Sequence, residues 1–499
     1  MHLLADIAAT APGNATWIFL GLALALALGF EFVNGFHDTA NAVATVIYTH
    51  SLKPTAAVVW SGIWNLIGVL TSSGAVAYGI VALLPVEMVL NVGSASGFAM
   101  VFALLISAIL WNLGTWYLGL PASSSHTLIG SILGVGLANS VLSGHAFGEG
   151  VNWAKAREVG TVLLVSPVIG FVCAALLLVL LKVIVRKPAL FSEPEKGKAP
   201  PLWIRSLLVG TCTGVSFAHG SNDGQKGMGL IVLILVGILP GTYALKMSET
   251  PENVRAICNQ AQVVSAMFDK KAGDTKLDEN AAVDELSSFI KQSGIQSDKT
   301  FAALATGSRL IESRLTNIKT FNDLPESERR SLRTDIYLVA NAIGKVIKGQ
   351  KLPDAGDRKL ASDFKDQLDG VTKYIPDWVK MAVALSLGLG TMVGWKRIVV
   401  TVGEKIGKSH LTYGQGAAAE VVAAITIFLA DRYGLPVSTT HVLSSGVAGT
   451  MAANGSGLQA QTLRNILLAW VLTLPVCIFL GSMLFAFGNY IVLHVVGLK

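Results

Sequence analysis

The sequence predicts an all-α polytopic membrane protein with two inverted-topology repeats, broken helices, two re-entrant hairpins and a small helical extramembrane insert. Three observations lead to this prediction. Hydrophobic residues make up 52% of the 499 residues, charged residues only 14%, and the mean hydropathy is +0.57, which is too apolar for a soluble protein of this length. Two short motifs each occur twice along the chain, and one long polar segment interrupts the second half.

Six apolar stretches are long enough to cross about 30 Å of hydrocarbon as helices. They are Trp17–Phe36, Thr55–Leu84, Phe98–Leu118, Gly160–Val185, Val379–Trp395 and Asn465–Leu493. No basic segment or clear cleavage site precedes the first stretch, which predicts a retained span and not a signal peptide. We therefore expect a multi-pass protein of the cell (inner) membrane, in contact with membrane lipid.

A Gly-Leu-Pro motif followed by hydroxyl residues occurs twice. Gly119–His126 has the sequence GLPASSSH and Gly434–His441 has GLPVSTTH, at an offset of 315 positions. A weaker pair of motifs places Asp38 over Asp223 at an offset of 185. Such self-similarity is the mark of an internal repeat. Both pairs fit one duplication if the second copy carries about 130 additional residues between its two motifs.

A polar segment of that length lies between Lys246 and Pro376. Its 131 residues hold 20 of the 38 Lys and Arg residues and 19 of the 32 Asp and Glu residues, with helical patterning in Phe301–Asn317 and Ser331–Lys348. The predicted domains are a first membrane repeat at 1–186, a basic cytoplasmic linker at 187–202, a second membrane repeat at 203–245 and 377–499, and the extramembrane insert at 246–376.

Basic residues in two short loops predict the orientation. One loop contains Arg186, Lys187, Lys196, Lys198 and Arg205, and the other contains Lys396, Arg397, Lys405 and Lys408. The positive-inside rule places both loops in the cytoplasm, and the insert and both termini are then expected outside. The same bias accounts for the net charge of +6, so no nucleic-acid partner is predicted.

Two stripes of polar residues interrupt the apolar sequence. The first contains Glu31, Asn34, Asp38, Asn41 and Thr45, and the second contains Ser216, His219, Asp223 and Lys226, with members three or four residues apart. This spacing places each stripe on one face of a helix. Ionisable groups inside a membrane cost about 2.5–3.5 kcal/mol each on insertion scales and mark functional cavities. A structural ion pair, such as Asp223 with Lys226, is the alternative interpretation.

Glycine-rich segments beside both stripes predict that the helices over Trp17–Tyr48 and Trp203–Tyr243 are broken, with exposed backbone lining a cavity. Carboxylates with Asn and Gln there suit a small cation or a proton. The predicted coupling-ion residues are His37, Asp38, Asn41, Asn222, Asp223, Gln225 and Lys226. Secondary candidates are Glu31, Asn34, His126 and His441.

The hydroxyl residues of each Gly-Leu-Pro motif stand just before an apolar helical run. A helix N-terminus offers free N–H groups, capping hydroxyls and the positive end of the helix dipole, which together bind anions. One such turn is usually an ordinary cap, but two copies that converge from two halves suit a tetrahedral oxyanion. The predicted anion ligands are Ser123, Ser124, Ser125, Thr127, Ser438, Thr439 and Thr440. No cofactor, fixed metal site or catalytic residue is predicted, and an enzyme is not expected.

These motifs resemble those of the PiT family of inorganic phosphate transporters, in particular its bacterial low-affinity members. The resemblance rests on Gly35–Ala42, His219–Gly224 and the two Gly-Leu-Pro motifs, and it covers essentially the whole chain. It implies secondary symport of inorganic phosphate driven by protons or sodium. It also implies uptake of divalent metal ions as neutral metal-phosphate complexes, and a homodimer. Glu420, 14 residues before Gly434, is a further secondary candidate, because other family members also carry an acid there.

Two departures from the family pattern bear on the coupling ion. Sodium-coupled members show Gly-Ala-Asn-Asp-x-Ala-Asn in both halves, whereas here His37 replaces the first Asn of one copy and Lys226 the last Asn of the other. Imidazole and ammonium groups are poor sodium ligands, which favours protons. Sodium-coupled transport of phosphate or another tetrahedral oxyanion is the alternative. A membrane sensor with the insert as signalling domain is an alternative of another class. Asp431 and Arg432 are interpreted only as a local ion pair.

Overall fold

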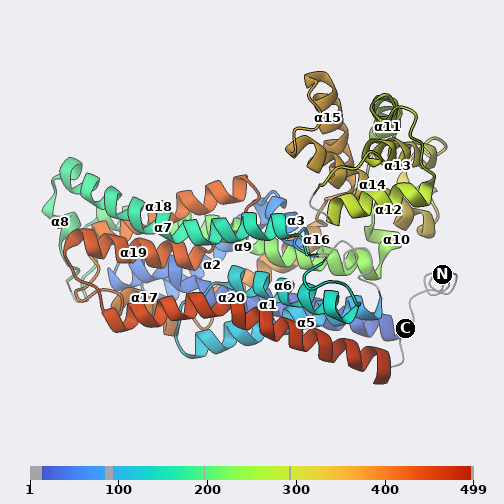
Figure 1. Ribbon diagram of the computed structural model, residues 1–499. Helices are drawn as coiled ribbons and strands as arrows, with labels where there is room; N and C mark the ends of the chain where they lie inside the picture. Colours follow the sequence, from blue (N-terminus) through green and yellow to red (C-terminus); the bar gives the residue numbers. More distant parts are fainter. Residues whose placement is uncertain (1–13, 85–93, 150, 196, 292–293, 496–499) are drawn as a thin grey trace.

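The computed structural model describes residues 14–84, 94–149, 151–195, 197–291 and 294–495. In these ranges the chain is helical and forms no sheet beyond one isolated bridge between Gly407 and Leu458. Long helices run side by side in one bundle, and a group of shorter helices stands at one end of it (Figure 1).

The bundle contains helices from both sides of the polar segment. Those before it are α1 (Asn14–Tyr48), α2 (Pro54–Thr71), α3 (Ala75–Val81), α5 (Ala95–Tyr117), α6 (Ser124–Leu142), α7 (Trp153–Val185), α8 (Pro188–Phe191), α9 (Leu202–Ile238) and α10 (Pro240–Tyr243). Those after it are α16 (Asp377–Met392), α17 (Lys396–Glu404), α18 (Tyr413–Arg432), α19 (Thr439–Asn454) and α20 (Ala460–Tyr490). Seven described helices are long and apolar enough to cross a membrane, or eight if α16 and α17, bent by 63°, form one span. The prediction of an all-helical, multi-pass membrane protein is confirmed.

In its described residues, the polar segment forms five α-helices and one short 3-10 helix (Phe321–Asp323) around an apolar cluster of its own. The α-helices are α11 (Pro251–Ala272), α12 (Glu279–Lys291), α13 (Thr300–Leu315), α14 (Glu326–Lys348) and α15 (Ala355–Thr372). The chain enters and leaves this segment side by side, because Lys246 N donates to Val371 O at 2.9 Å. One Arg333 guanidinium nitrogen donates to Ala244 O and Thr372 O, which ties the two ends together.

The predicted helix breaks are wrong for α1 and for most of α9. Helix α1 continues through Gly29 and Gly35, and α9 continues to Ile238. The glycines instead allow close approach of neighbouring helices: a Cβ on Gly35 would lie 2.3 Å from Leu387 O, and one on Gly220 would lie 2.1 Å from Asn65 O. The breaks lie elsewhere, in the turns between α5 and α6, α16 and α17, and α18 and α19.

The two polar stripes meet in the middle of the bundle. Helix α1 packs against α9 and α16, and α9 packs against α2 and α18. Helix α6 packs on α20 and α19 packs on α7. Helices α8 and α17 lie at the end of the bundle opposite the polar segment (Figure 1).

Candidate functional site

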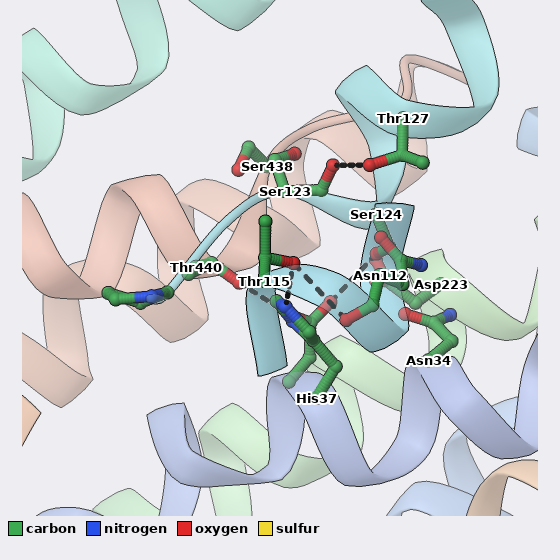
Figure 2. A network of polar contacts seen from close by, with 12 residues as sticks. Asn34, His37, Asn112, Thr115, Ser123, Ser124, Thr127, Asp223, Ser438 and Thr440 are labelled. Atoms are coloured by element: carbon green, nitrogen blue, oxygen red, sulfur yellow. Dashed lines mark hydrogen bonds and ion pairs between the residues drawn. The ribbon is translucent and has the colours of Figure 1, made fainter. Parts of the chain in front are cut away.

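Asp38, in the C-terminal half of α1, is contacted by residues from both halves of the sequence. Its side chain is buried, and both carboxylate oxygens accept hydrogen bonds from hydroxyl groups. Ser124 Oγ, in the first turn of α6, donates to Oδ2 at 2.8 Å, and Thr440 Oγ1, in the first turn of α19, donates to Oδ1 at 2.6 Å. Figure 2 shows Ser124 and Thr440 approaching the same region beside His37 from two separate helices.

The turns that place these hydroxyls have nearly the same geometry. Gly119 and Gly434 take positive φ angles of 68° and 65°, a conformation that favours glycine. Ser123 and Ser438 cap α6 and α19 by accepting hydrogen bonds from the backbone N–H of His126 and His441. The next residues, Ser124 and Thr439, therefore begin helices whose N-termini lie near Asp38.

The remaining predicted hydroxyl ligands have different partners. Ser125 Oγ donates to Val437 O, and Thr127 Oγ1 donates to Ser123 O. Thr439 Oγ1 is buried without a hydrogen-bond partner. The two turns thus offer one unpartnered hydroxyl and two that are bound to Asp38.

His37 and Asp38 are joined by a hydrogen bond between neighbouring side chains. His37 Nδ1 lies 3.1 Å from Asp38 Oδ1, and its Nε2 lies 3.1 Å from Thr115 Oγ1. Thr115 donates its own hydroxyl proton to backbone carbonyls on α5, so Nε2 must be the donor to Thr115. The proton between Nδ1 and Asp38 can then belong to either group, giving imidazolium with carboxylate or imidazole with carboxylic acid.

The polar stripe on α9 lies next to Asp38 and contributes His219, Asp223 and Lys226. His219 Nε2 lies 3.8 Å from Asp38 Oδ2 and 3.4 Å from Asp223 Oδ2. Lys226 Nζ lies 2.8 Å from Asp223 Oδ1, and both of these side chains are fully buried. The expected contact of Asp223 with Lys226 is therefore present.

Three ligand atoms in this cluster are close enough to share one small cation. One atom each from Asp38, His219 and Asp223 lie within 4.8 Å of one another. Several buried polar atoms around them lack hydrogen-bond partners, among them Asn34 Oδ1, Asn222 Oδ1 and both amide atoms of Asn112. Unsatisfied buried polar groups are costly, and such a concentration is typical of a site that binds a solute or ion.

Other predicted residues lie at various distances from this centre. Glu31 is buried beside Gly227, where any Cβ would collide with its carboxylate, and Asn34 donates to it at 3.3 Å. Glu420 is buried and accepts a hydrogen bond from Thr211, two helical turns before His219. The rings of His126 and His441 lie 4.6 Å apart, between the two turns. The side chain of Asn41 lies outside the described residues.

The interpretation of Asp431 and Arg432 as an ion pair is wrong. Asp431 turns inward and accepts hydrogen bonds from Ser221 Oγ at 2.6 Å and from Gln225 Nε2, whereas Arg432 is exposed. Gln225 Oε1 also accepts from Val76 N at 2.9 Å. Asp431 and Gln225 therefore hold the middle of α9 in position.

Sequence reasoning missed three buried polar residues, two of which contact the cluster. They are Asn65, Asn112 and Thr115. Asn65 Oδ1 lies 2.8 Å from His219 Nδ1, and Thr115 contacts His37. Asn112 and Thr115 stand three residues apart in an apolar stretch, so the spacing rule that identified the two stripes would also have found them.

The chain is similar to known proteins over most of its length. The sequence model of the phosphate transporter family matches residues 34–481. The chain belongs to this family. It is 42% identical to the low-affinity inorganic phosphate transporter PitA of Escherichia coli (strain K12), with 94% of this chain and 96% of that protein covered. It is 27% identical to the probable low-affinity inorganic phosphate transporter of Bacillus subtilis (strain 168), with 93% and 96% covered.

A solved structure shares the fold of this family member. It is described as the sodium-dependent phosphate transporter, with a TM-score of 0.52, 20% sequence identity, and 94% of this chain and 98% of that chain covered. The resemblance to the PiT family is confirmed, as is the expected location in the cell inner membrane as a multi-pass protein.

Proposed function

We propose that this chain imports inorganic phosphate together with protons, and that it also accepts phosphate as a neutral complex with a divalent metal ion. One observation carries the proposal. The two hydroxyls that the repeated turns present, Ser124 Oγ and Thr440 Oγ1, both donate to the carboxylate of Asp38. A phosphate held between the N-termini of α6 and α19 would compete with Asp38 for these donors.

This competition links the anion to a cation. When Ser124 and Thr440 turn toward phosphate, Asp38 loses two donors and lies next to a second negative charge. A carboxylate in that position is costly unless it binds a proton or pairs with a cation. Phosphate binding then raises the affinity of the His37–Asp38 pair for a proton. By linkage, protonation raises the affinity for phosphate by the same factor.

The proton assignment is supported by the chemistry of the cluster. His37, His219 and Lys226 surround the two aspartates with nitrogen groups, whereas sodium prefers oxygen ligands. Sodium remains the alternative coupling ion, because Asp38, Asp223 and the unpartnered Asn222 Oδ1 offer oxygens in the same region. A neutral metal-phosphate complex would lower the charge brought into this buried site, which is why it suits as a second substrate.

We also propose the two-repeat architecture and the domain division expected from the sequence, with inverted halves and re-entrant hairpins. Helix pairing supports it: α1 packs on α16 as α9 packs on α2, and α6 packs on α20 as α19 packs on α7. In each of these four pairings, a helix of one half packs on a helix of the other half. The homodimer stays a prediction of the family resemblance.

A proton-uptake measurement tests the proposed coupling at the level of binding. Phosphate is added to purified protein in weakly buffered detergent solution, and the protons taken up per phosphate bound are counted in the wild type and in Asp38→Asn. We expect about one more proton per phosphate in the wild type. Equal proton uptake in both proteins, with phosphate still bound by both, would contradict the role assigned to Asp38.

A further inference from the structure

A basic cavity lies outside the central site, where α5 ends and α16 bends into α17. It has a volume of about 620 Å³. Its lining includes three cationic residues, Lys396, Arg397 and Lys405, together with the aromatic residues Trp116 and Trp395. Helix α17, which lines the cavity, lies at the end of the bundle opposite the polar segment (Figure 1).

The three cations of this cavity form no ion pair with an acidic side chain in the part of the chain that the structure describes. Arg397 donates to Tyr117 O at 2.7 Å and stacks on the rings of Trp116 and Tyr117, so its charge remains. Among the described residues, neither Lys396 nor Lys405 has an acidic partner at ion-pair distance. Glu404, the acid on the same helix, interacts with Tyr48 of α1. Three positive charges therefore face one cavity.

Apolar surface leads to this cavity from two helices. Tyr117 and Leu118 at the end of α5 are 65% and 69% exposed, and Leu113 and Leu110 lie exposed one and two turns before them. On α16, Leu389 and Leu385 are exposed in the same way before the bend. Cationic side chains next to Trp and Tyr at the end of lipid-facing helices are typical of the membrane–water interface.

We infer that this cavity binds the phosphate headgroup of an anionic phospholipid, whose acyl chains lie along the exposed leucines of α5 and α16. Basic pockets between membrane helices on the cytoplasmic side suit such headgroups. Free inorganic phosphate has the same headgroup chemistry but would leave the leucine-lined approach without an occupant. The exposed leucines therefore favour a phospholipid over free inorganic phosphate as the occupant of the cavity.

The bound lipid would stabilise a contact that reaches the central site. Trp116 Nε1 donates to Gly394 O at 2.8 Å, and Thr401 Oγ1 donates to Gly119 O at 2.7 Å. Gly119 begins the turn that carries Ser123 and Ser124. A headgroup clamped by α17 therefore holds α17 against the first of the two anion-binding turns.

Lipid titration followed by native mass spectrometry tests this inference on the full chain in detergent. Phosphatidylglycerol is compared with phosphatidylcholine in the wild type, in the double variant Lys396→Ala/Lys405→Ala, and in the control Lys198→Ala. Lys198 is exposed at the same basic end but pairs with Glu195. We expect one tightly bound phosphatidylglycerol in the wild type and the control. Since each lysine near an anionic headgroup contributes about a fivefold factor, affinity in the double variant should fall roughly 30-fold.

The outcomes separate the two sources of phosphate. No preference for phosphatidylglycerol over phosphatidylcholine, or equal binding by the double variant, would overturn the inference. Displacement of phosphatidylglycerol by millimolar inorganic phosphate would assign the cavity to the free anion and also overturn it. Retention of the lipid under that condition, with loss in the double variant alone, supports it.

Discussion

Thr440 Oγ1 donates to Asp38 Oδ1 at 2.6 Å, although 402 positions of sequence separate the two residues. With the bond from Ser124 to the other carboxylate oxygen, this contact makes one aspartate the shared acceptor of both repeated turns. The chain thereby connects its predicted anion ligands directly to its predicted ion-coupling group.

Removing the Thr440 hydroxyl should weaken phosphate transport while the protein still folds. A hydrogen bond to a charged group contributes about 1.5–3 kcal/mol, so Thr440→Ala should lower kcat/KM for phosphate roughly 10- to 100-fold. Thr440→Ser keeps the hydroxyl and is the matched control. Uptake by reconstituted protein measures the effect. Wild-type kinetics in Thr440→Ala and Ser124→Ala, singly and combined, would refute the anion site.

Replacing Asp38 by Asn should separate coupling from transport. Without the shared proton, gradient-driven accumulation of phosphate should be lost, whereas exchange of internal for external phosphate should continue. Glu31→Gln, on the same face of α1, tests the other candidate carboxylate and should still accumulate phosphate if Asp38 is the group that carries the proton. Both activities are measured in the same liposomes with radioactive phosphate. Accumulation by Asp38→Asn at the wild-type level would show that another group carries the proton.

Asp223→Asn should destabilise the protein as well as impair transport. It leaves the fully buried Lys226 ammonium without the carboxylate that lies 2.8 Å away, and an uncompensated buried charge costs about 3–5 kcal/mol. Adding Lys226→Met should restore the folded fraction but not transport. Size-exclusion profiles and thermal unfolding in detergent report the folded fraction. A single variant as stable as the wild type would contradict the energetic role of the pair.

Alanine substitutions at the neighbouring residues Asp431 and Arg432 should have very different effects on phosphate uptake. Asp431→Ala leaves Ser221 and Gln225 without their acceptor, so the middle of α9 should lose its position and uptake should fall about tenfold or more. Arg432→Ala, at an exposed site, should transport normally. Comparable uptake by the two variants would show that the hydrogen bonds of Asp431 do not position the site.

The polar insert should be removable. Because Lys246 and Val371 are hydrogen-bonded neighbours, replacing Glu249–Lys373 by a short flexible linker should leave a protein that inserts and retains part of its uptake. Membrane fractionation and uptake in cells measure the two properties. Failure of the shortened chain to insert would show that the segment belongs to the transport core.

Much of the helical content could be predicted from apolar length alone, and the central residues from their spacing. The positions of helix breaks could not, because glycine serves both to interrupt a helix and to let two helices approach. In α1 and α9 the second role applies, as the close contacts of Gly35 and Gly220 show. Only three-dimensional packing distinguishes the two.

The detailed partners within the site also depend on tertiary structure. Spacing identified Asp38 and the hydroxyl residues separately, but no sequence pattern shows that Ser124 and Thr440 bind the same carboxylate. The ion-pair interpretation of Asp431 is wrong for a similar reason. Its sequence neighbour Arg432 is exposed, whereas Asp431 itself accepts a hydrogen bond from Ser221 of α9. Long-range hydrogen bonds of this kind are visible only once the helices are assembled.

Phosphate uptake under separately imposed gradients tests the central claim most directly. Purified wild-type protein is reconstituted into liposomes, and phosphate accumulation is followed with an inward proton gradient in the absence of sodium, and with an inward sodium gradient at equal pH on both sides. Proton symport through His37 and Asp38 predicts accumulation in the first condition and none in the second. Accumulation that follows the sodium gradient and does not respond to the pH gradient would contradict it.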